Sequence, residues 1–116
     1  MSQLRQTHEL LSTATQLGLE ITRVRMQAIG QNTPVRLKLL NATHYRRERL
    51  DPDTGTWEAV GSISTLPKSV KVEAGASGAP TFDPNGLAAA STTLRVVGSA
   101  GVKTLTTNIL GEVTIS

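Results

Sequence analysis

The stretch "ITRVRMQAIGQNTPVRLKL", Ile21–Leu39, contains the point at which the periodicity of the sequence changes. Before Pro34, apolar residues recur every three or four positions, which is typical of an amphipathic helix. After Pro34, apolar and basic residues alternate through "VRLKL", which is typical of a strand with one buried face. Proline favours a break between the two elements because it cannot continue a helix. The stretch therefore predicts a helix followed by a β-sheet.

The predicted helix extends back from this point over about residues 3–30, a length of about 40 Å at 1.5 Å per residue. Its apolar stripe recurs at spacings of 4, 3, 4, 3 and 4, and we expect Leu17 and Ile21, in the middle of the stripe, to anchor the core. Gly30 is the expected C-terminal cap. The stripe consists of Leu10, Ala14, Leu17, Ile21, Val24 and Ala28, and Leu11, Leu19, Met26 and Ile29 widen it on one side.

Short β-patterned segments separated by turn residues fill the rest of the chain. "GSAG", residues 98–101, predicts a hairpin between the segments 92–97 and 102–107. One long helix followed by antiparallel strands with short connections indicates the α+β class, with the N-terminal helix packed on an antiparallel sheet. We expect residues 1–30 to form the helix and residues 31–116 the β domain of the same globular unit. The other predicted strands are 35–39, 44–50, 57–63, 70–74 and 113–115.

The core of this domain has few aromatic residues to draw on, because they make up only 3% of the chain. Phe82 is the only phenylalanine, and "DPNG", residues 83–86, follows it directly. Asp, Pro and Gly each favour tight turns for a different physical reason. We therefore expect Phe82 to fill the core at the end of a strand, and residues 83–86 to reverse the chain at the sheet edge.

Positive charge is concentrated in the first half of the chain. Residues 1–50 hold eight Lys or Arg and three acids, a balance of +5, whereas residues 51–116 hold four and six, a balance of −2. Five of the basic residues lie close together, between positions 36 and 49. We favour the interpretation that they cover a solvated strand face; the alternative is that they attract an anion such as nucleic acid. Strand alternation divides the cluster between two faces, and Glu48 partly cancels its field. Its members are Arg36, Lys38, Arg46, Arg47 and Arg49.

Motifs of catalysis or cofactor binding are weak. His8 and His44 lie in no pattern typical of a catalytic triad, and "GASGAP" lacks the lysine of a phosphate-binding loop. The chain has no cysteine, which excludes disulfides and thiolate metal sites. Asp51, Asp53 and Glu58 offer the oxygen ligands that calcium prefers, but they are too few for a full loop and favour a plain turn. The sequence thus predicts no enzyme, no cofactor and no metal.

Three segments together resemble a known family. They are "RVRMQAIGQNTPVRL", a helix end followed by a basic strand, "FDPNGLA", and "TTNILGEVTIS", a strand, a glycine and a final strand. In order and spacing they resemble the soluble part of GspH/FimT-type minor pseudopilins and minor type IV pilins. The resemblance covers nearly the whole chain. It implies a pilin-like fold whose N-terminal helix continues as a membrane anchor, and this sequence opens almost directly into the helix, as though a longer one had been cut.

The resemblance implies a structural role. Such a protein is a subunit of a type II secretion pseudopilus or a type IV pilus, with other pilin-like subunits as partners. It is anchored in the inner membrane, and its soluble domain lies in the periplasm or in a surface filament. The alternative is a minor pilin that takes up DNA through the basic strands. Against strong DNA binding, Glu112 follows Gly111 where the family often has arginine, so any DNA binding is expected to be weak.

Overall fold

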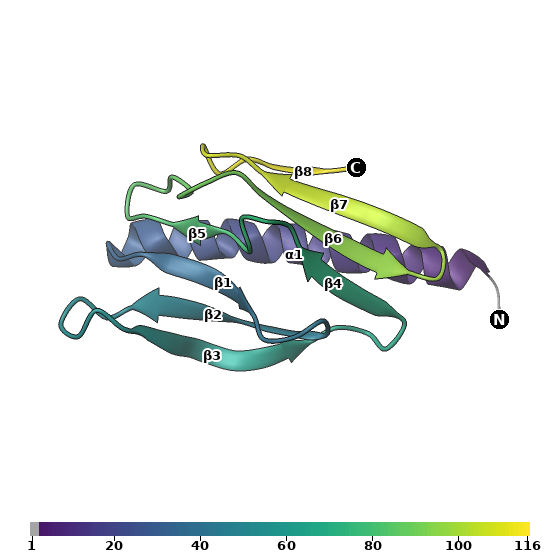
Figure 1. Ribbon diagram of the computed structural model, residues 1–116, viewed down its shortest axis with the longest axis horizontal. Coiled ribbons are helices and arrows are strands. Elements are labelled where there is room, and N and C mark those ends of the chain that lie inside the picture. The colour runs from purple at the N-terminus through teal and green to yellow at the C-terminus, as the bar shows by residue number, and fades with distance from the viewer. Residues whose placement is uncertain (1–2) are drawn as a thin grey trace.

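The computed structural model describes residues 3–116, with side chains described from residue 6 onward. One helix, α1 (Gln3–Gln31), precedes eight strands that form two antiparallel sheets (Figure 1). The expected order of helix and strands is therefore confirmed as an α+β architecture. The strands are β1 (Val35–Leu39), β2 (His44–Leu50), β3 (Trp57–Thr65), β4 (Val70–Ala74), β5 (Thr81–Phe82), β6 (Thr92–Gly98), β7 (Gly101–Thr107) and β8 (Val113–Ile115).

The strands divide between two four-stranded sheets. The sequence predicted a helix packed on antiparallel strands but did not fix the number of sheets. The first sheet has the order β3-β2-β1-β5 and the second the order β4-β6-β7-β8. Figure 1 shows α1 running behind both sheets along the length of the molecule, while β2 and β3 project past it on one side. This projection leaves the inner face of β2 only partly covered, which decides where the groove described below lies.

The core lies between α1 and the two sheets. The predicted helix stripe, from Leu10 to Ala28, is buried along its whole length. Opposite it lie the inward residues of β1, Val35 and Leu37, and those of the second sheet, such as Leu105. Among residues 6–116, Phe82 on β5 is the largest fully buried side chain, and it pairs with Val35 across the first sheet.

The turn after Phe82 forms as its residues predict. The Gly86 amide donates to the Asp83 carbonyl at 2.9 Å, and the Asp83 carboxylate accepts from the amides of Asn85 and Leu87. Gly86 has a φ of 81°, in the left-handed region that glycine enters without steric cost. The turn lies beside β5, at the edge of the first sheet.

The helix ends differently from the prediction. Asn32, not Gly30, takes the left-handed conformation, with a φ of 54°. The amides of Asn32 and Thr33 donate to the carbonyls of Ile29 and Ala28, which is the Schellman pattern. Asparagine can replace glycine here because its short polar side chain tolerates this conformation. The helix thus ends at Gln31, and no helix within residues 3–116 is both long and apolar enough to cross a membrane.

A second correction concerns the residues expected to widen the core stripe. Leu11, Leu19, Met26 and Ile29 are between 41% and 57% exposed, and so they do not belong to the core. With the exposed Thr15 and Thr22 they form their own row along α1, at spacings of 4, 4, 3, 4 and 3. We call these six residues the outer stripe. The helix therefore has one apolar side that its own sheets bury and a second, largely apolar side that they leave open.

Candidate functional site

The basic residues of β1 and β2 lie on two faces of the first sheet, as the alternation predicted. Arg36 pairs with Glu48 and Lys38 with Arg46, which places these four side chains on the outer face. Arg47 pairs with the buried Leu37 and lies on the inner face. Arg49 shares that face, since it pairs with Val35. A single ligand surface therefore cannot meet all five cations at once.

On the outer face, Glu48 neutralises two of the arginines. Arg36 donates to its Oε1 at 2.6 and 2.8 Å, and Arg46 donates to its Oε2 at 2.7 and 2.9 Å. The Arg36 guanidinium also lies 4.2 Å from the centre of the Trp57 ring, in cation–π geometry. Burial alone raises the pKa of Glu48, but the hydrogen bonds and charges of the two arginines outweigh it and hold the pKa below its ordinary value.

On the inner face, the other two arginines also have carboxylate partners. Arg47 Nε lies 3.2 Å from Glu20 Oε2 of α1, and its Nη1 donates to Gln27 Oε1 at 2.9 Å. Arg49 pairs with Glu58 of β3. Within the described residues, Lys38 is the one member of the cluster without an ion pair. Five cations and three paired carboxylates, those of Glu20, Glu48 and Glu58, leave a local charge of +2.

We therefore expect at most weak, sequence-independent binding of DNA. A net charge of two gives a log–log salt slope no steeper than about −2 on the counterion-release relation. The dissociation constant at physiological salt is expected to be on the order of 10⁻⁴ to 10⁻⁶ M, the non-specific range. A fluorescence titration with duplex DNA at two salt concentrations measures both quantities. Submicromolar binding that disappears in an Arg47→Ala/Arg49→Ala variant would instead make DNA capture the main function.

The acidic turn after β2 does not gather into a metal site. The Asp51 carboxylate accepts the backbone amide of Asp53, and Glu58 pairs with Arg49. No group of three or more potential metal ligands occurs among the residues that the structure describes.

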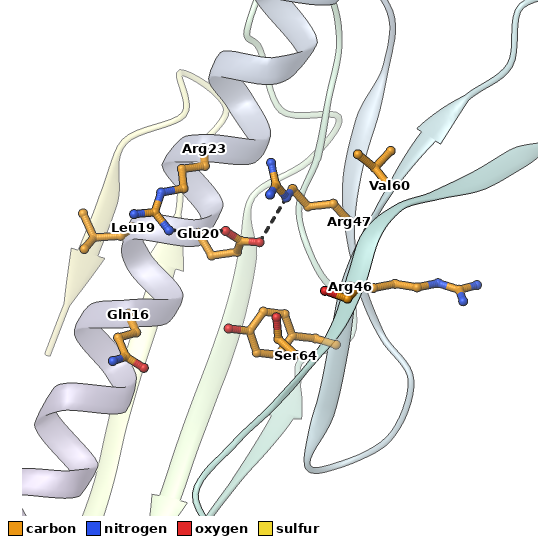
Figure 2. A pocket seen from close by; sticks show the side chains of 11 residues that line it. Gln16, Leu19, Glu20, Arg23, Arg46, Arg47, Val60 and Ser64 are labelled. Atoms are coloured by element: carbon orange, nitrogen blue, oxygen red, sulfur yellow. Dashed lines mark ion pairs between the residues drawn. The ribbon is translucent and has the colours of Figure 1, made fainter.

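A groove of about 600 Å³ separates α1 from the projecting strands β2 and β3. Figure 2 shows Glu20 of α1 facing Arg47 of β2 across it, whereas the Arg23 side chain turns toward Leu19 and the Arg46 side chain points away from the groove. The phenol of Tyr45 also lines it; burial, the larger influence, raises the pKa of this phenol, and the Ser64 side chain lowers it. The remaining lining residues are Gln16, Leu19, Val60, Gly61, Ser62 and Ser64.

A β-bulge in β3 shapes the far wall of this groove. Tyr45 pairs with Ser64 and Arg47 with Val60, so three residues of β3, Gly61–Ile63, stand opposite Arg46 alone. Gly61 has a φ of 75°, which makes the chain bend at this point. Bulges bend the strand that carries them, and this one lies on an edge strand, where it also interrupts pairing with other chains.

Comparison with known proteins gives the family. A profile described as type II transport protein GspH matches residues 13–111, well over half of the chain. The chain belongs to the GspH family. The resemblance to GspH/FimT-type minor pseudopilins and pilins is thereby confirmed, and with it the role of a structural pseudopilin or pilin subunit.

Solved structures of two proteins share the fold of this GspH-family chain. The minor pseudopilin EpsH from the type 2 secretion system of Vibrio cholerae has a TM-score of 0.75 at 12% identity, covering 93% of this chain and 96% of its own. The type IV minor pilin FimU of Pseudomonas aeruginosa has a TM-score of 0.77 at 16% identity, covering 95% and 90%. At these identities the likeness concerns the fold alone. No curated protein is a significant match.

Sequence reasoning missed the residues that connect α1 to the loops at its C-terminal end. Arg25 Nε donates to the Gly86 carbonyl at 2.8 Å. A Cβ placed on Gly111 would lie 2.5 Å from Arg25 Cδ, and one on Gly86 would lie 2.7 Å from Ile29 Cδ1. Both glycines also have a positive φ, 81° for Gly86 and 87° for Gly111, so a side chain at either position would be strained as well as close to the helix. The sequence predicted a turn at residues 83–86, but nothing local indicated that this turn and Gly111 contact the same arginine.

Proposed function

We propose that this GspH-family subunit joins its filament through the exposed side of α1, with the outer stripe as the contact. Partners are other pilin-like subunits of a type II secretion pseudopilus or a type IV pilus. The protein acts by assembly, not by catalysis. The observation that carries the proposal is the exposure of the outer stripe in a domain whose core is otherwise closed.

The outer stripe has the form of a helix-packing surface. From Leu11 to Ile29 it runs for about 27 Å at 1.5 Å per residue, and its residues recur every three or four positions, as do those of helices that pack side by side. Thr15 and Thr22 continue the row between the large apolar side chains, and the Thr22 hydroxyl donates to the Gly18 carbonyl of its own helix at 3.2 Å. Large apolar side chains exposed along one row favour a protein contact, whereas scattered single ones are common on any surface.

The loops at the end of α1 extend this surface. The Ala88 amide donates to the Ile109 carbonyl at 2.8 Å, so the loop after Phe82 and the loop after β7 lie together. Arg25 donates a hydrogen bond to Gly86 in the first loop and lies close to Gly111 in the second, next to Ile29 of the outer stripe. Their tips carry three more exposed apolar side chains, Leu87, Ile109 and Leu110. The proposed contact surface is therefore widest at the C-terminal end of the helix.

Family membership supports the cellular setting that we propose. A pseudopilin or pilin subunit is anchored in the inner membrane by a hydrophobic helical segment, and its folded domain lies in the periplasm or in the assembled filament. In that setting the outer stripe faces the neighbours along the filament, and the two sheets face away from them.

A double substitution, Leu19→Asp/Met26→Asp, tests the proposal. Both side chains are exposed, so the free energy of unfolding should change by no more than about 1–2 kcal/mol, mainly through helix propensity. We expect incorporation of the full-length protein into filaments to fall more than tenfold. The measurement is its amount in filaments purified from cells that produce the complete set of pilin-like subunits.

Val102→Asp is the matched control. Val102 is as exposed as Ile29, at 41% for each, but lies in the β6–β7 hairpin and not on the outer stripe. Its substitution should leave incorporation unchanged. Equal incorporation of the parent and the double variant, with both folded, would reject the outer stripe as the contact.

A further inference from the structure

The groove between α1 and β2–β3 has more cationic than anionic groups. Among the described residues that line it, Glu20 is the one carboxylate, and its side chain is 13% exposed. Two guanidinium groups, those of Arg23 and Arg47, share it. Arg47 is engaged at close range, whereas Arg23 is 68% exposed and its Nη1 lies 3.9 Å from the Glu20 carboxylate. The groove therefore has one positive charge in excess and one guanidinium that is only loosely held.

The groove borders the outer stripe. Leu19 belongs to the outer stripe and also lines the groove. Arg23 follows it by four residues and so lies one turn further along the same side of α1. A helix packed on the outer stripe would thus have its flank at the mouth of the groove. This step rests on the function proposed above.

We propose that the mouth of the groove receives one acidic side chain from the helix of a neighbouring subunit, with its carboxylate on the exposed guanidinium group of Arg23. The apolar row of that helix packs on the outer stripe, and the acid sets its position along α1. Arginine pairs with carboxylates through fixed, directed hydrogen bonds, so an arginine beside the outer stripe specifies register better than apolar contact does. The groove then selects among subunits that have similar apolar helices.

The charge of the groove favours a carboxylate over a nucleic acid. One carboxylate balances the single excess charge. A phosphate chain would bring several negative charges to a site where Glu20 already lies 3.2 Å from Arg47. Repulsion between like charges in a partly buried site opposes that arrangement.

The test uses the folded domain and pairs of synthetic amphipathic helical peptides. Each peptide has an apolar row at helical spacing and one Glu on its flank, and its partner has Gln at that position. The Glu position is moved along the flank through successive peptides. We expect one Glu peptide to bind at least tenfold more tightly than its Gln partner, measured by fluorescence anisotropy. That ratio should fall to about one in Arg23→Gln.

Arg95→Gln is the control, since Arg95 is also exposed but pairs with Glu73 on the second sheet. It should keep the full ratio. If Glu and Gln peptides bind equally at every position, the groove has no role in selection, although the outer stripe remains a docking surface. If no peptide binds, both proposals are wrong. Displacement of the Glu peptide by a short DNA duplex at a lower concentration than by the unlabelled peptide would assign the groove to nucleic acid instead.

Discussion

Replacing Phe82 with alanine is expected to lower the free energy of unfolding by about 3–5 kcal/mol, the usual range for a buried phenylalanine. Phe82 is fully buried and is the largest such side chain in the described part of the chain. It lies on a strand of two residues, so little backbone pairing remains to hold that strand once its side chain is removed. Since domains are stable by only about 5–15 kcal/mol, a large part of the total would be lost.

Chemical denaturation measures this change, and Trp57→Ala is the matched aromatic control. Trp57 is half-buried and stacks on Arg36 at the surface of the first sheet, so its truncation should cost less than that of Phe82. Leu17→Ala and Ile21→Ala should each cost about 2–5 kcal/mol, because both side chains are fully buried in α1. A loss below about 1 kcal/mol for Phe82→Ala would mean that the core is not organised around this residue.

Replacing Glu48 with glutamine is expected to cost about 2–3 kcal/mol, which is below the range for breaking a fully buried ion pair. Glu48 is 3% exposed, and its carboxylate accepts hydrogen bonds from Arg36 and Arg46. The glutamine would leave two neighbouring guanidinium groups without a counter-charge. We expect a smaller loss of stability than for a fully buried ion pair because both arginines are partly exposed to water. Glu73→Gln, in the exposed pair with Arg95, should change stability by about 1 kcal/mol or less.

The lowered pKa of Glu48 also predicts a pH dependence. Its carboxylate is stabilised in the folded state, so its contribution is fully present above the ordinary value of 4.5. That contribution is lost as the pH falls through the lower pKa of the folded state. Unfolding midpoints measured across this acidic range should therefore decline more steeply for the parent than for Glu48→Gln. Parallel curves would show that the two arginines do not stabilise the ionised carboxylate.

Most of the fold could be predicted from the sequence, because residue spacing and turn residues determine the structure of a single helix, strand or turn without information about distant parts of the chain. The core stripe of α1 followed from its 3.5-residue spacing, and the division of the basic residues between two faces followed from strand alternation. The turn after Phe82 followed from Asp83 and Gly86. The cap of α1 was placed two residues early, at Gly30, since glycine and asparagine can both adopt the required conformation and only the surrounding chain selects between them.

Features that depend on contacts between distant elements could not be predicted in this way. The basic residues of β1 and β2 formed a cluster in the sequence, but their pairing with Glu20 and Glu58 depends on how α1 and β3 lie against β2. The groove depends on a bulge in β3 and on the projection of β2 past the helix. The exposure of Leu19 and Met26 likewise depends on where the two sheets stop, although their regular spacing could have indicated a second row.

Cysteine cross-linking at the outer stripe tests most directly the claim that α1 docks on neighbouring subunits. Residues 1–116 contain no cysteine, so Met26→Cys and Val102→Cys each introduce one reactive position into this domain. Each variant is produced in full length together with pilin-like subunits that carry single cysteines on their own helices, and assembled filaments are treated with a short thiol cross-linker. We predict cross-linked products between position 26 and a neighbouring helix, and none from position 102. Products from position 102 alone would contradict the account.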